Sequence, residues 1–469
     1  MDRPADSIPL TDALNEAPLS IFHLRAMFTS GMGFFTDAYD LFIIGVALTL
    51  VKAEWHLSTS EATLASSVAL LGAVVGAFVF GRLADLLGRK AIYGLEAAVM
   101  AIAAIASAFA PNIAWLIAAR FLLGIGIGGD YPVSATIMSE YANRRDRGRL
   151  VSMVFSTQAA GLIVGPVVGL TLLAAGVQAD LAWRLMLGLG AVPALAVIYL
   201  RRTLPESPRY RARVRGDATG AAASLAAYTG GQIQGVAVTE PRIHERLRDF
   251  LSNPRNLLLL LGTAGSWFLL DYAFYGNTIS TTLILSSVAP HAALIQSVAW
   301  SLVIFALAAA PGYVLAIATI DRIGHRRLQW IGFLGMAAAF ATIGLVPNLT
   351  HVVLPFLVIY GISYFFTEFG PNVTTFVLPS EVFPVTSRTT GHGIASGIAK
   401  IGAFVGVYAF PHLASALGLH VTLLFTAGVA VAGALLTLVL PEPAGLTIEE
   451  ASREDLVISR ISRPETVTA

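Results

Sequence analysis

Long apolar runs recur along the whole chain and constrain its fold more than any other feature. A helix needs about 20 apolar residues to cross the hydrocarbon core of a bilayer. Runs of roughly this length or longer occupy residues 21–51, 61–85, 91–110, 113–140, 149–176, 181–203, 256–287, 293–320, 328–347, 351–380, 389–418 and 420–440. Only 13% of the residues are charged, whereas soluble proteins carry about 25%. The pattern predicts an all-α integral membrane protein with twelve transmembrane helices.

Basic residues are distributed unevenly between the predicted loops, which predicts the orientation. Arginine and lysine crowd the loops after the second, fourth, sixth, eighth and tenth runs, and the alternate loops hold almost none. Basic loops stay on the cytoplasmic side. The acidic start of the chain lacks the basic region of a signal peptide. We therefore expect a multi-pass protein of the cell inner (plasma) membrane with both termini in the cytoplasm.

The two halves of the chain resemble each other. The segment GRLADLLGRK at 81–90 recurs as IDRIGHRR at 320–327, and Leu-Pro-Glu at 204–206 recurs at 440–442. An even number of spans in each repeat gives both repeats the same orientation, as in transporters that bind substrate at mid-membrane between the repeats. The repeats predict two six-helix bundles related by a pseudo-two-fold axis. The expected domains are an N-terminal tail (1–20), a first bundle (21–203), a cytoplasmic linker (204–255), a second bundle (256–440) and a C-terminal tail (441–469).

The fourth run contains a block that a purely structural membrane helix does not need. Four glycines between Gly124 and Gly129 are followed at once by Asp130, Tyr131 and Pro132. A carboxylate at membrane depth costs several kcal/mol and usually marks an ion or substrate path. Glycine lets a neighbouring helix or a ligand approach the backbone, and proline frees a carbonyl. The block predicts a polar pathway at this point.

The seventh run carries Trp267, Asp271 and Tyr275 at a spacing of four residues, which places them on one helical face. The two aromatic residues alone fit equally well with packing against a neighbouring helix. Asp271 between them favours a face that lines a cavity and offers an indole N–H, a carboxyl and a phenol.

Lys400 lies inside the run at 389–418, ten or more residues from either end. Snorkelling to the membrane surface explains such a position poorly. We expect Lys400 to face the interior, where it would lower the cost of binding an anion or pair with an acid.

Several kinds of chemistry lack a motif in this sequence. There is no cysteine, so no thiolate metal site can form, and neither a phosphate-binding Gly-x4-Gly-Lys-Ser/Thr loop nor a His-Glu-x-x-His motif occurs. Gly124, Gly126 and Gly129 match a dinucleotide pattern by letter but lie inside a membrane-length run. We expect no metal, no cofactor, no nucleic-acid partner and no enzyme activity, and transport driven by an ion gradient rather than by ATP.

The twelve runs, the repeated loop motif and the Pro-Glu-Ser-Pro-Arg exit at 205–209 resemble the major facilitator superfamily. Within it, the block at 128–140 resembles the signature of the phosphate:proton symporter family. The blocks at 34–42, 267–276 and 370–372 are also similar to that family. The loop motifs are shared with sugar porters, whereas the blocks of the fourth and seventh runs are more specific.

The resemblance implies roles for individual residues. The expected substrate ligands are Tyr131, Gln158, Trp267, Asp271, Tyr275 and Asn372, with Lys400 nearby. The expected proton-coupling residues are Asp37, Glu96, Arg120, Asp130 and Asp271. Each role has a structural alternative. Gln158 could make only an interhelical hydrogen bond, and the segment that contains Asn372 could serve only to break a helix. The charged residues could form static ion pairs that hold the spans together. Arg120 and Asp130 lie about 15 Å apart along one helix, so each needs another partner, for which Asp37 and Glu96 are the candidates.

The loop motifs predict a gate on the cytoplasmic side. Carboxylates beside helix N-termini and opposing arginines can hold the inner ends of the two bundles together and separate when the bundles rock. The expected gate residues are Asp85, Arg89, Lys90, Glu140, Asp321, Arg326 and Glu381.

These expectations combine into one hypothesis: a monomer in membrane lipid that takes up inorganic phosphate with protons by alternating access. Asp271 must be protonated when the anion binds, because two like charges at close range in a low dielectric repel by several kcal/mol. The alternatives are a sugar or organic-acid porter of the same superfamily and, less favoured, a non-transporting nutrient receptor. A receptor typically carries a large cytoplasmic extension, whereas the tail here is short.

Overall fold

Twelve helical spans dominate the computed structural model, which describes residues 7–231, 233, 237–243 and 245–462. Of the predicted tails and linker, residues 1–6, 232, 234–236, 244 and 463–469 lie outside the described part. Within that part, twelve helices or helix pairs are long and apolar enough to cross a membrane. The predicted fold class is confirmed.

The first half contains six spans. They are α2 (Ile21–Glu54), α3 (Thr59–Leu87), α4 with α5 (Arg89–Ile92, Leu95–Ala108), α6 (Ile113–Tyr141), α7 with α8 (Arg147–Ser156, Gln158–Ala174) and α9 with α10 (Ala179–Gly188, Ala191–Thr203). The second half also contains six. They are α14 (Pro254–Ile279), α16 with η2 and α17 (Leu294–Ile304, Phe305–Ala309, Ala310–Ile323), α18 (His325–Leu345), α19 with α20 (Val353–Phe369, Pro371–Val382), α21 (Arg388–Leu417) and α22 (Leu419–Thr437).

Shorter elements lie outside the spans. They are β1 (Ser7–Pro9), α1 (Leu10–Asn15), α11 (Pro208–Tyr210), η1 (Arg211–Arg215), α12 (Ala218–Tyr228), β2 (Ala237–Thr239), α13 (Leu247–Ser252), α15 (Thr281–Val288), η3 (Leu349–His351), α23 (Ile448–Ser452) and α24 (Glu454–Ser462). The strands β1 and β2 form a small parallel pair with Ser7 opposite Ala237. The run at 256–287 is not one helix, because α14 ends at Ile279 and α15 begins at Thr281.

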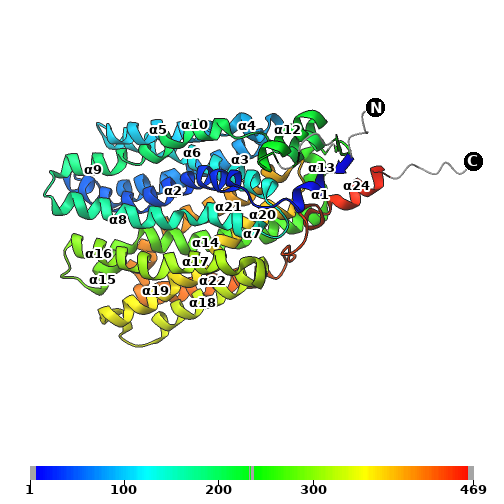
Figure 1. Ribbon diagram of the computed structural model, residues 1–469. Helices are drawn as coiled ribbons and strands as arrows, with labels where there is room; N and C mark the ends of the chain where they lie inside the picture. The colour runs from blue at the N-terminus through cyan, green and yellow to red at the C-terminus, as the bar shows by residue number, and fades with distance from the viewer. Residues whose placement is uncertain (1–6, 232, 234–236, 244, 463–469) are drawn as a thin grey trace, which may run out of the picture.

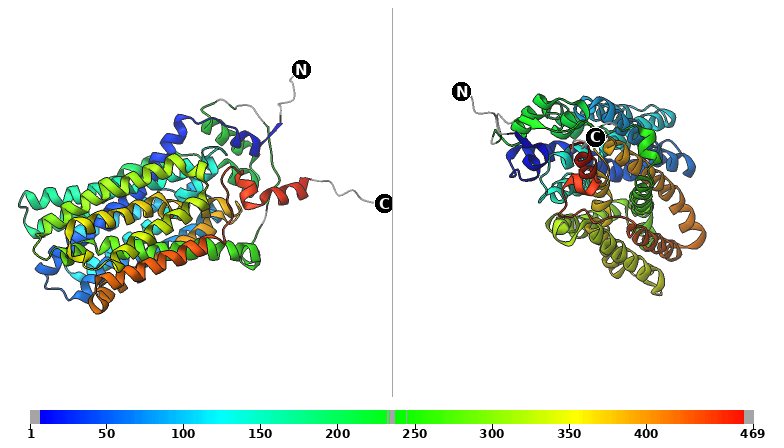
Figure 2. Two further views of the ribbon diagram at one scale, coloured as in Figure 1. Left: turned by 90° about the horizontal axis from the view of Figure 1, so that it is seen from below. Right: turned by 90° about the vertical axis from the view of Figure 1, so that its right-hand side faces the viewer.

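The two halves lie side by side with their helices roughly aligned, the first half above the second in Figure 1. The short elements α1, α12, α13 and α24 lie at one end of the molecule, which we call the tail end (Figures 1 and 2). The loop that joins α15 to α16 lies at the opposite end. Most of the short elements outside the spans therefore gather at the tail end.

Two glycines mark equivalent turns in the two halves. Gly88 ends α3 with φ 106° and ψ 149°, and Gly324 ends α17 with φ 101° and ψ 143°. Side chains rarely tolerate such positive φ values, so glycine is needed at both points. Glu206 accepts a hydrogen bond from the backbone N–H of Lys90, and Glu442 accepts one from that of His325. The sequence repeat therefore corresponds to a structural repeat.

The glycines of the fourth span bring its backbone against α3. A Cβ placed on Gly124 would lie 1.8 Å from the carbonyl oxygen of Ala69, and one on Gly128 would lie 2.0 Å from that of Ala73. No flexible side chain can yield at these contacts, because the neighbouring atoms belong to the backbone. The close packing of α3 on α6 therefore requires glycine and holds Tyr131 in place on α6.

We expect Gly124→Val to separate α3 from α6 and to lower the stability of the folded protein by at least about 1–3 kcal/mol, the usual range for overpacking. Thermal unfolding of the detergent-solubilised protein measures the change. Gly428→Ala is the matched control, because nothing lies within 4 Å of a Cβ placed there in α22. An equal melting temperature for both variants would contradict the close approach.

Candidate transport site and gate

A single buried lysine organises the centre of the molecule, where the two halves meet. Lys400 on α21 is 1% exposed. Its Nζ donates to Asp271 Oδ2 at 3.0 Å, to the Tyr275 hydroxyl at 2.6 Å and to the Tyr131 hydroxyl at 3.3 Å. An ammonium group has three donors, and all three are used here. The expected inward position of Lys400 is confirmed.

The first half supplies an acid and two polar ligands to the same centre. The Tyr131 hydroxyl donates to Asp37 Oδ2 at 2.6 Å, and Gln158 Nε2 donates to the same oxygen at 3.2 Å. The hydroxyls of Tyr131 and Tyr275 lie 3.3 Å apart. The fourth-span and seventh-span blocks therefore meet face to face, and Asp37 belongs to this centre rather than to a separate path.

The aromatic residues of the seventh span face the same place. The ring of Trp267 lies 5.9 Å from the ring of Tyr131, and its side chain is buried. With Asp271 and Tyr275 both on Lys400, all three members of the predicted helical face turn toward the centre. Packing of the two aromatic residues against a neighbouring helix therefore does not by itself account for this face.

Hydrogen bonds extend this centre into the second half. The Tyr313 hydroxyl donates to Gln158 Oε1 at 2.9 Å, and Asn372 Nδ2 donates to the Tyr313 hydroxyl at 2.9 Å. Asn372 Nδ2 also donates to Glu368 Oε2. Tyr313 and Glu368 were not predicted as site residues. We call the following residues the central cluster: Asp37, Tyr131, Gln158, Trp267, Asp271, Tyr275, Tyr313, Glu368, Asn372 and Lys400.

A route leads to the central cluster from the end opposite the tails. A cavity of about 510 Å³ between the halves is lined by Lys52, Thr59 and Ser286, among others. A narrow cavity of about 20 Å³ is lined by Asp37, Tyr275 and Lys400. Both cavities include Ser66 and Ile279 in their linings. The cluster is thus approached from this end.

The predicted partners of Arg120 are wrong. Arg120 on α6 makes a two-pronged pair with Asp40 on α2 rather than with Asp37 or Glu96. Asp40 lies three residues from Asp37, so the two acids occupy neighbouring turns of one helix. Arg120 and Asp40 both line the narrow cavity, which places them beside the route to the cluster.

Asp130 and Glu96 share Arg201, which was not predicted as a site residue. Arg201 Nη1 lies 2.9 Å from Glu96 Oε1 and 2.8 Å from Asp130 Oδ1, and its side chain is buried. Ser134 also donates to Asp130, at 2.6 Å. The position of Arg201 at the end of a long apolar run indicated a signal of membrane topology. The helix α10 continues to Thr203, however, and keeps the side chain of Arg201 inside the protein.

The gate residues of the first half form an ion-pair cluster at the tail end. Arg89 Nη2 lies 3.2 Å from Asp85 and 3.0 Å from Glu140. Asp85 Oδ2 accepts the backbone N–H of Thr390 at 2.6 Å, in the first turn of α21. The first turn of a helix has free N–H groups and a partial positive charge, so this contact ties the first half to the second.

The second half repeats this arrangement with one substitution. His325 occupies the place of the first arginine and lies 3.2 Å from Asp321 and 2.8 Å from Glu381. Asp321 Oδ2 accepts the backbone N–H of Arg149 at 2.8 Å, in the first turn of α7. Each half therefore places a carboxylate on a helix N-terminus of the other half.

Two further arginines connect the halves directly. Arg147 Nε lies 2.7 Å from Glu381, and Arg388 Nη1 lies 3.0 Å from Glu140. All four side chains are buried. Together with the two helix-terminus contacts, these pairs close the tail end of the interface between the halves.

Two of the predicted gate residues take other contacts. The side chain of Lys90 is exposed, and Arg326 Nη1 donates to the Leu440 carbonyl oxygen at 3.0 Å. Neither forms an ion pair across the halves in the part of the chain that the structure describes. Their charges instead contribute to the basic character of the two predicted loops in which they lie.

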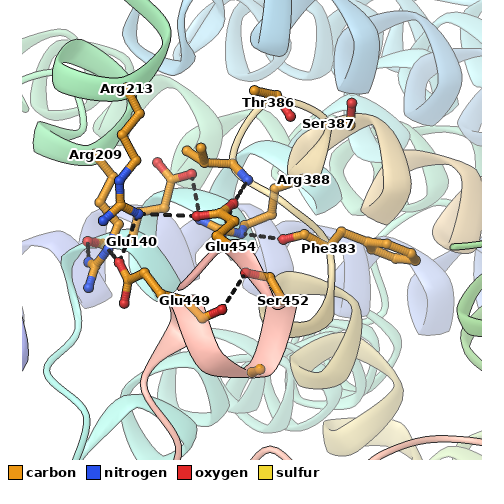
Figure 3. A network of polar contacts seen from close by, with 12 residues as sticks. Glu140, Arg209, Arg213, Phe383, Thr386, Ser387, Arg388, Glu449, Ser452 and Glu454 are labelled. Atoms are coloured by element: carbon orange, nitrogen blue, oxygen red, sulfur yellow. Dashed lines mark hydrogen bonds and ion pairs between the residues drawn. The ribbon is translucent and has the colours of Figure 1, made fainter. Parts of the chain in front are cut away.

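The C-terminal segment adds a layer to this gate that the sequence did not predict. Glu449 on α23 lies 2.8 Å from Arg209 and 2.9 Å from Arg213 of the linker (Figure 3). Glu454 on α24 lies 3.1 Å from Arg213 and 3.3 Å from Arg388 (Figure 3). The tail thus joins the linker to the second half directly beneath the interface.

The charge of Glu449 depends on these arginines. Burial alone would raise the pKa of Glu449, but Arg209 and Arg213 outweigh burial and hold that pKa below the usual range of a glutamate. A carboxyl with a lowered pKa stabilises the fold above its unfolded pKa, and the contribution is lost as pH falls toward the folded value. The stabilising contribution of Glu449 is therefore fully present at neutral pH and declines below about pH 4.

We expect Glu449→Gln to loosen the C-terminal segment, because two buried arginines lose their shared carboxylate. Breaking one side of a buried ion pair typically costs about 3–5 kcal/mol. Hydrogen–deuterium exchange of residues 448–458 at neutral pH should then be at least about a hundredfold faster than in the unmodified protein. The neighbouring exposed acid provides the control variant, Asp455→Asn, which should exchange as the unmodified protein does. Unchanged protection in Glu449→Gln would refute the role of this contact.

The two bundles, the buried polar centre between them and the gate at one end define a membrane transporter. The chain belongs to the family described as sugar (and other) transporter, whose model matches residues 26–454. It is similar to the probable inorganic phosphate transporter 1-6 of Arabidopsis thaliana, at 36% identity over 94% of this chain and 96% of the relative. It is also similar to inorganic phosphate transporter 1-4 of the same plant, at 35% identity over 96% of each chain.

Solved structures show the same fold. The proton:xylose symporter XylE bound to 6-bromo-6-deoxy-D-glucose matches with a TM-score of 0.77 and 20% identity, over 92% of this chain and 99% of that one. The partially occluded inward-open form of XylE from E. coli matches with a TM-score of 0.73 and 21% identity, over 90% of this chain and 99% of that one. The fold is that of the major facilitator superfamily.

Proposed function

We propose that this protein is a proton-coupled symporter that takes up inorganic phosphate by alternating access between its two halves. The observation that carries the proposal is the contact of Lys400 with Asp271 and two phenols at the junction of the halves. The curated relatives, which are named inorganic phosphate transporters, support the substrate. The tail end would face the cytoplasm of a plasma membrane, as its basic loops indicate.

The residues of the central cluster suit a small tetrahedral oxyanion. Tyr131, Tyr275 and Trp267 supply hydroxyl and indole donors, and Gln158 and Asn372 supply amide N–H groups. Lys400 supplies a compact positive charge without the fixed fork of an arginine. Such a set binds an anion from several sides and also allows its release.

Exchange of partners at Lys400 couples the anion to a proton. A phosphate oxygen that takes the ammonium group displaces Asp271, which then lies beside another negative charge. Two unit charges about 4 Å apart repel by roughly 4 kcal/mol at an effective dielectric constant near 20. Asp271 therefore takes up a proton as the anion binds. Loss of this proton on the cytoplasmic side returns Asp271 to Lys400 and expels the anion.

Proton entry follows the charged residues beside the narrow cavity. Asp40 and Arg120 line that cavity together with Asp37 and Lys400. Asp130 on α6, Glu96 on α5 and Arg201 on α10 form a second charged group nearer the tail end. Arg120, Asp130 and Glu96 would relay or stabilise the proton on its way, while the ion pairs at the tail end break and re-form as the halves rock.

Labelled phosphate uptake into proteoliposomes with an imposed inward proton gradient tests the substrate. We expect uptake that collapses with a protonophore and is inhibited by excess arsenate but not by glucose or benzoate. Arsenate has the same shape and charge as phosphate and would engage the same donors. Inhibition by glucose with no phosphate uptake would establish a sugar porter instead.

We expect Asp271→Asn to bind and exchange phosphate with weaker pH dependence and to lose uphill uptake, because asparagine is neutral at every pH. Phosphate counterflow measures exchange, and accumulation against a gradient measures coupling. The control is Asp180→Asn at an exposed acid of α9, which should accumulate phosphate normally. Normal proton-driven accumulation by Asp271→Asn would end this mechanism.

A further inference from the structure

One buried acid of the central cluster is only partly hydrogen-bonded. Glu368, near the end of α19, is 0% exposed, and its Oε1 atom has no hydrogen-bond partner. Asn372 Nδ2 donates to the other carboxyl oxygen, Oε2, and the phenol of Tyr313 also lies beside this carboxyl. In contrast, Asp271 has Lys400, Asp40 has Arg120, and Asp37 accepts from Tyr131 and Gln158.

The surroundings of Glu368 supply no charge to balance an ionised carboxyl. The helices α17, α18 and α20 pack against α19. The titratable groups nearest to Glu368 are the phenols of Tyr313 on α17 and Tyr364 on α19 itself. The charged residues of α17 and α18 lie at the tail end of those helices, between Asp321 and Arg327. A buried carboxylate without a cation costs several kcal/mol, so these surroundings favour the protonated form of Glu368.

Glu368 is connected to the expected substrate ligands through one amide group. Asn372 Nδ2 has two hydrogens, which go to Glu368 and to Tyr313. Tyr313 in turn donates to Gln158, which donates to Asp37. A substrate oxygen that takes an N–H of Asn372 must remove it from one of these two neighbours. The states of Glu368 and of the substrate site are therefore linked.

We propose that Glu368 is a second proton-binding carboxyl of the transport cycle, distinct from Asp271, whose proton is held while substrate occupies Asn372. This inference rests on the proposed phosphate:proton symport. Bound anion near Asn372 opposes ionisation of Glu368 by repulsion and by competition for the Asn372 amide that donates to it. Linkage is reciprocal, so a protonated Glu368 favours the anion to the same extent. After the anion leaves on the cytoplasmic side, opening of the tail end admits water to Glu368, and its proton can be released there.

The number of coupled protons tests this proposal. Proteoliposomes that contain the full-length protein receive a gradient of one pH unit, with the membrane potential clamped to zero by valinomycin and equal potassium. Each coupled proton then multiplies the limiting ratio of internal to external phosphate by ten. We expect Glu368→Gln, which mimics the protonated acid, to accumulate phosphate to a ratio about tenfold lower than the unmodified protein does, since a tenfold ratio corresponds to one pH unit per proton.

Two variants separate proton binding from a packing role. Tyr313→Phe breaks the same hydrogen-bond chain but keeps the carboxyl, so it should alter the apparent affinity and keep the full accumulation ratio. Glu368→Asp also keeps a titratable group and should retain the full ratio. A full ratio in Glu368→Gln would overturn the proposal, and so would a reduced ratio in Tyr313→Phe equal to that of Glu368→Gln.

Infrared spectroscopy provides a test that does not depend on phosphate. The unmodified protein should show a carbonyl band of a protonated carboxylic acid that is absent in Glu368→Gln and present in Tyr313→Phe. If Glu368→Gln does not fold, Glu368→Asp should shift that band without removing it. Identical bands in the unmodified protein and in both Glu368 variants would refute the proposal. If the unmodified protein accumulates no phosphate, the proposed function fails, and the infrared result still decides whether Glu368 carries a proton.

Discussion

The charge of Lys400 is the constraint on which the arrangement of the two halves depends. An ammonium group taken out of water loses several kcal/mol of hydration, and only close partners in a low-dielectric interior restore it. Asp271 and Tyr275 come from α14 and Tyr131 from α6, so the partners of one cation belong to both halves. Lysine suits this position because its three donors can turn toward different acceptors. A charge satisfied in this way can change partners without leaving the interface, which is what a transport cycle requires.

The gate at the tail end uses many ion pairs, and their net strength is modest. Each buried pair gains Coulomb energy but loses the hydration of both charges, and the two nearly cancel. An interface held by such pairs is specific in its geometry at little net gain in free energy. The two halves also contribute unequally, because Arg89 in the first half corresponds to His325 in the second. The C-terminal segment adds contacts to Arg388 and to the linker, so closure involves the tail as well as both bundles.

The sequence predicted the spans, their number and the faces of the fourth and seventh helices, because hydropathy and helical period report these directly. It failed where a partner had to be chosen between helices. Asp37 and Asp40 lie on adjacent turns, so no periodicity argument could select Asp40 as the partner of Arg120. Arg201 lies near the end of the run at 181–203, where a basic residue is also expected as a signal of topology. Glu368 adjoins the Gly370-Pro371 helix break, where the sequence indicated only an interruption.

Two helices connect the central cluster to the gate. On α21, Lys400 lies ten residues, about 15 Å along the axis, from Thr390, whose N–H binds Asp85. On α6, Tyr131 lies nine residues from Glu140, which binds Arg89 and Arg388. A helix of this length moves largely as a rigid rod, so a change of partner at Lys400 alters the position of the first turn of α21. Because the carboxylate of Asp85 accepts from that first turn, α21 connects the central charge physically to the contacts at the tail end. The glycine-backed contact of α6 with α3 keeps the opposing surface fixed, so that the displacement appears at the interface between the halves.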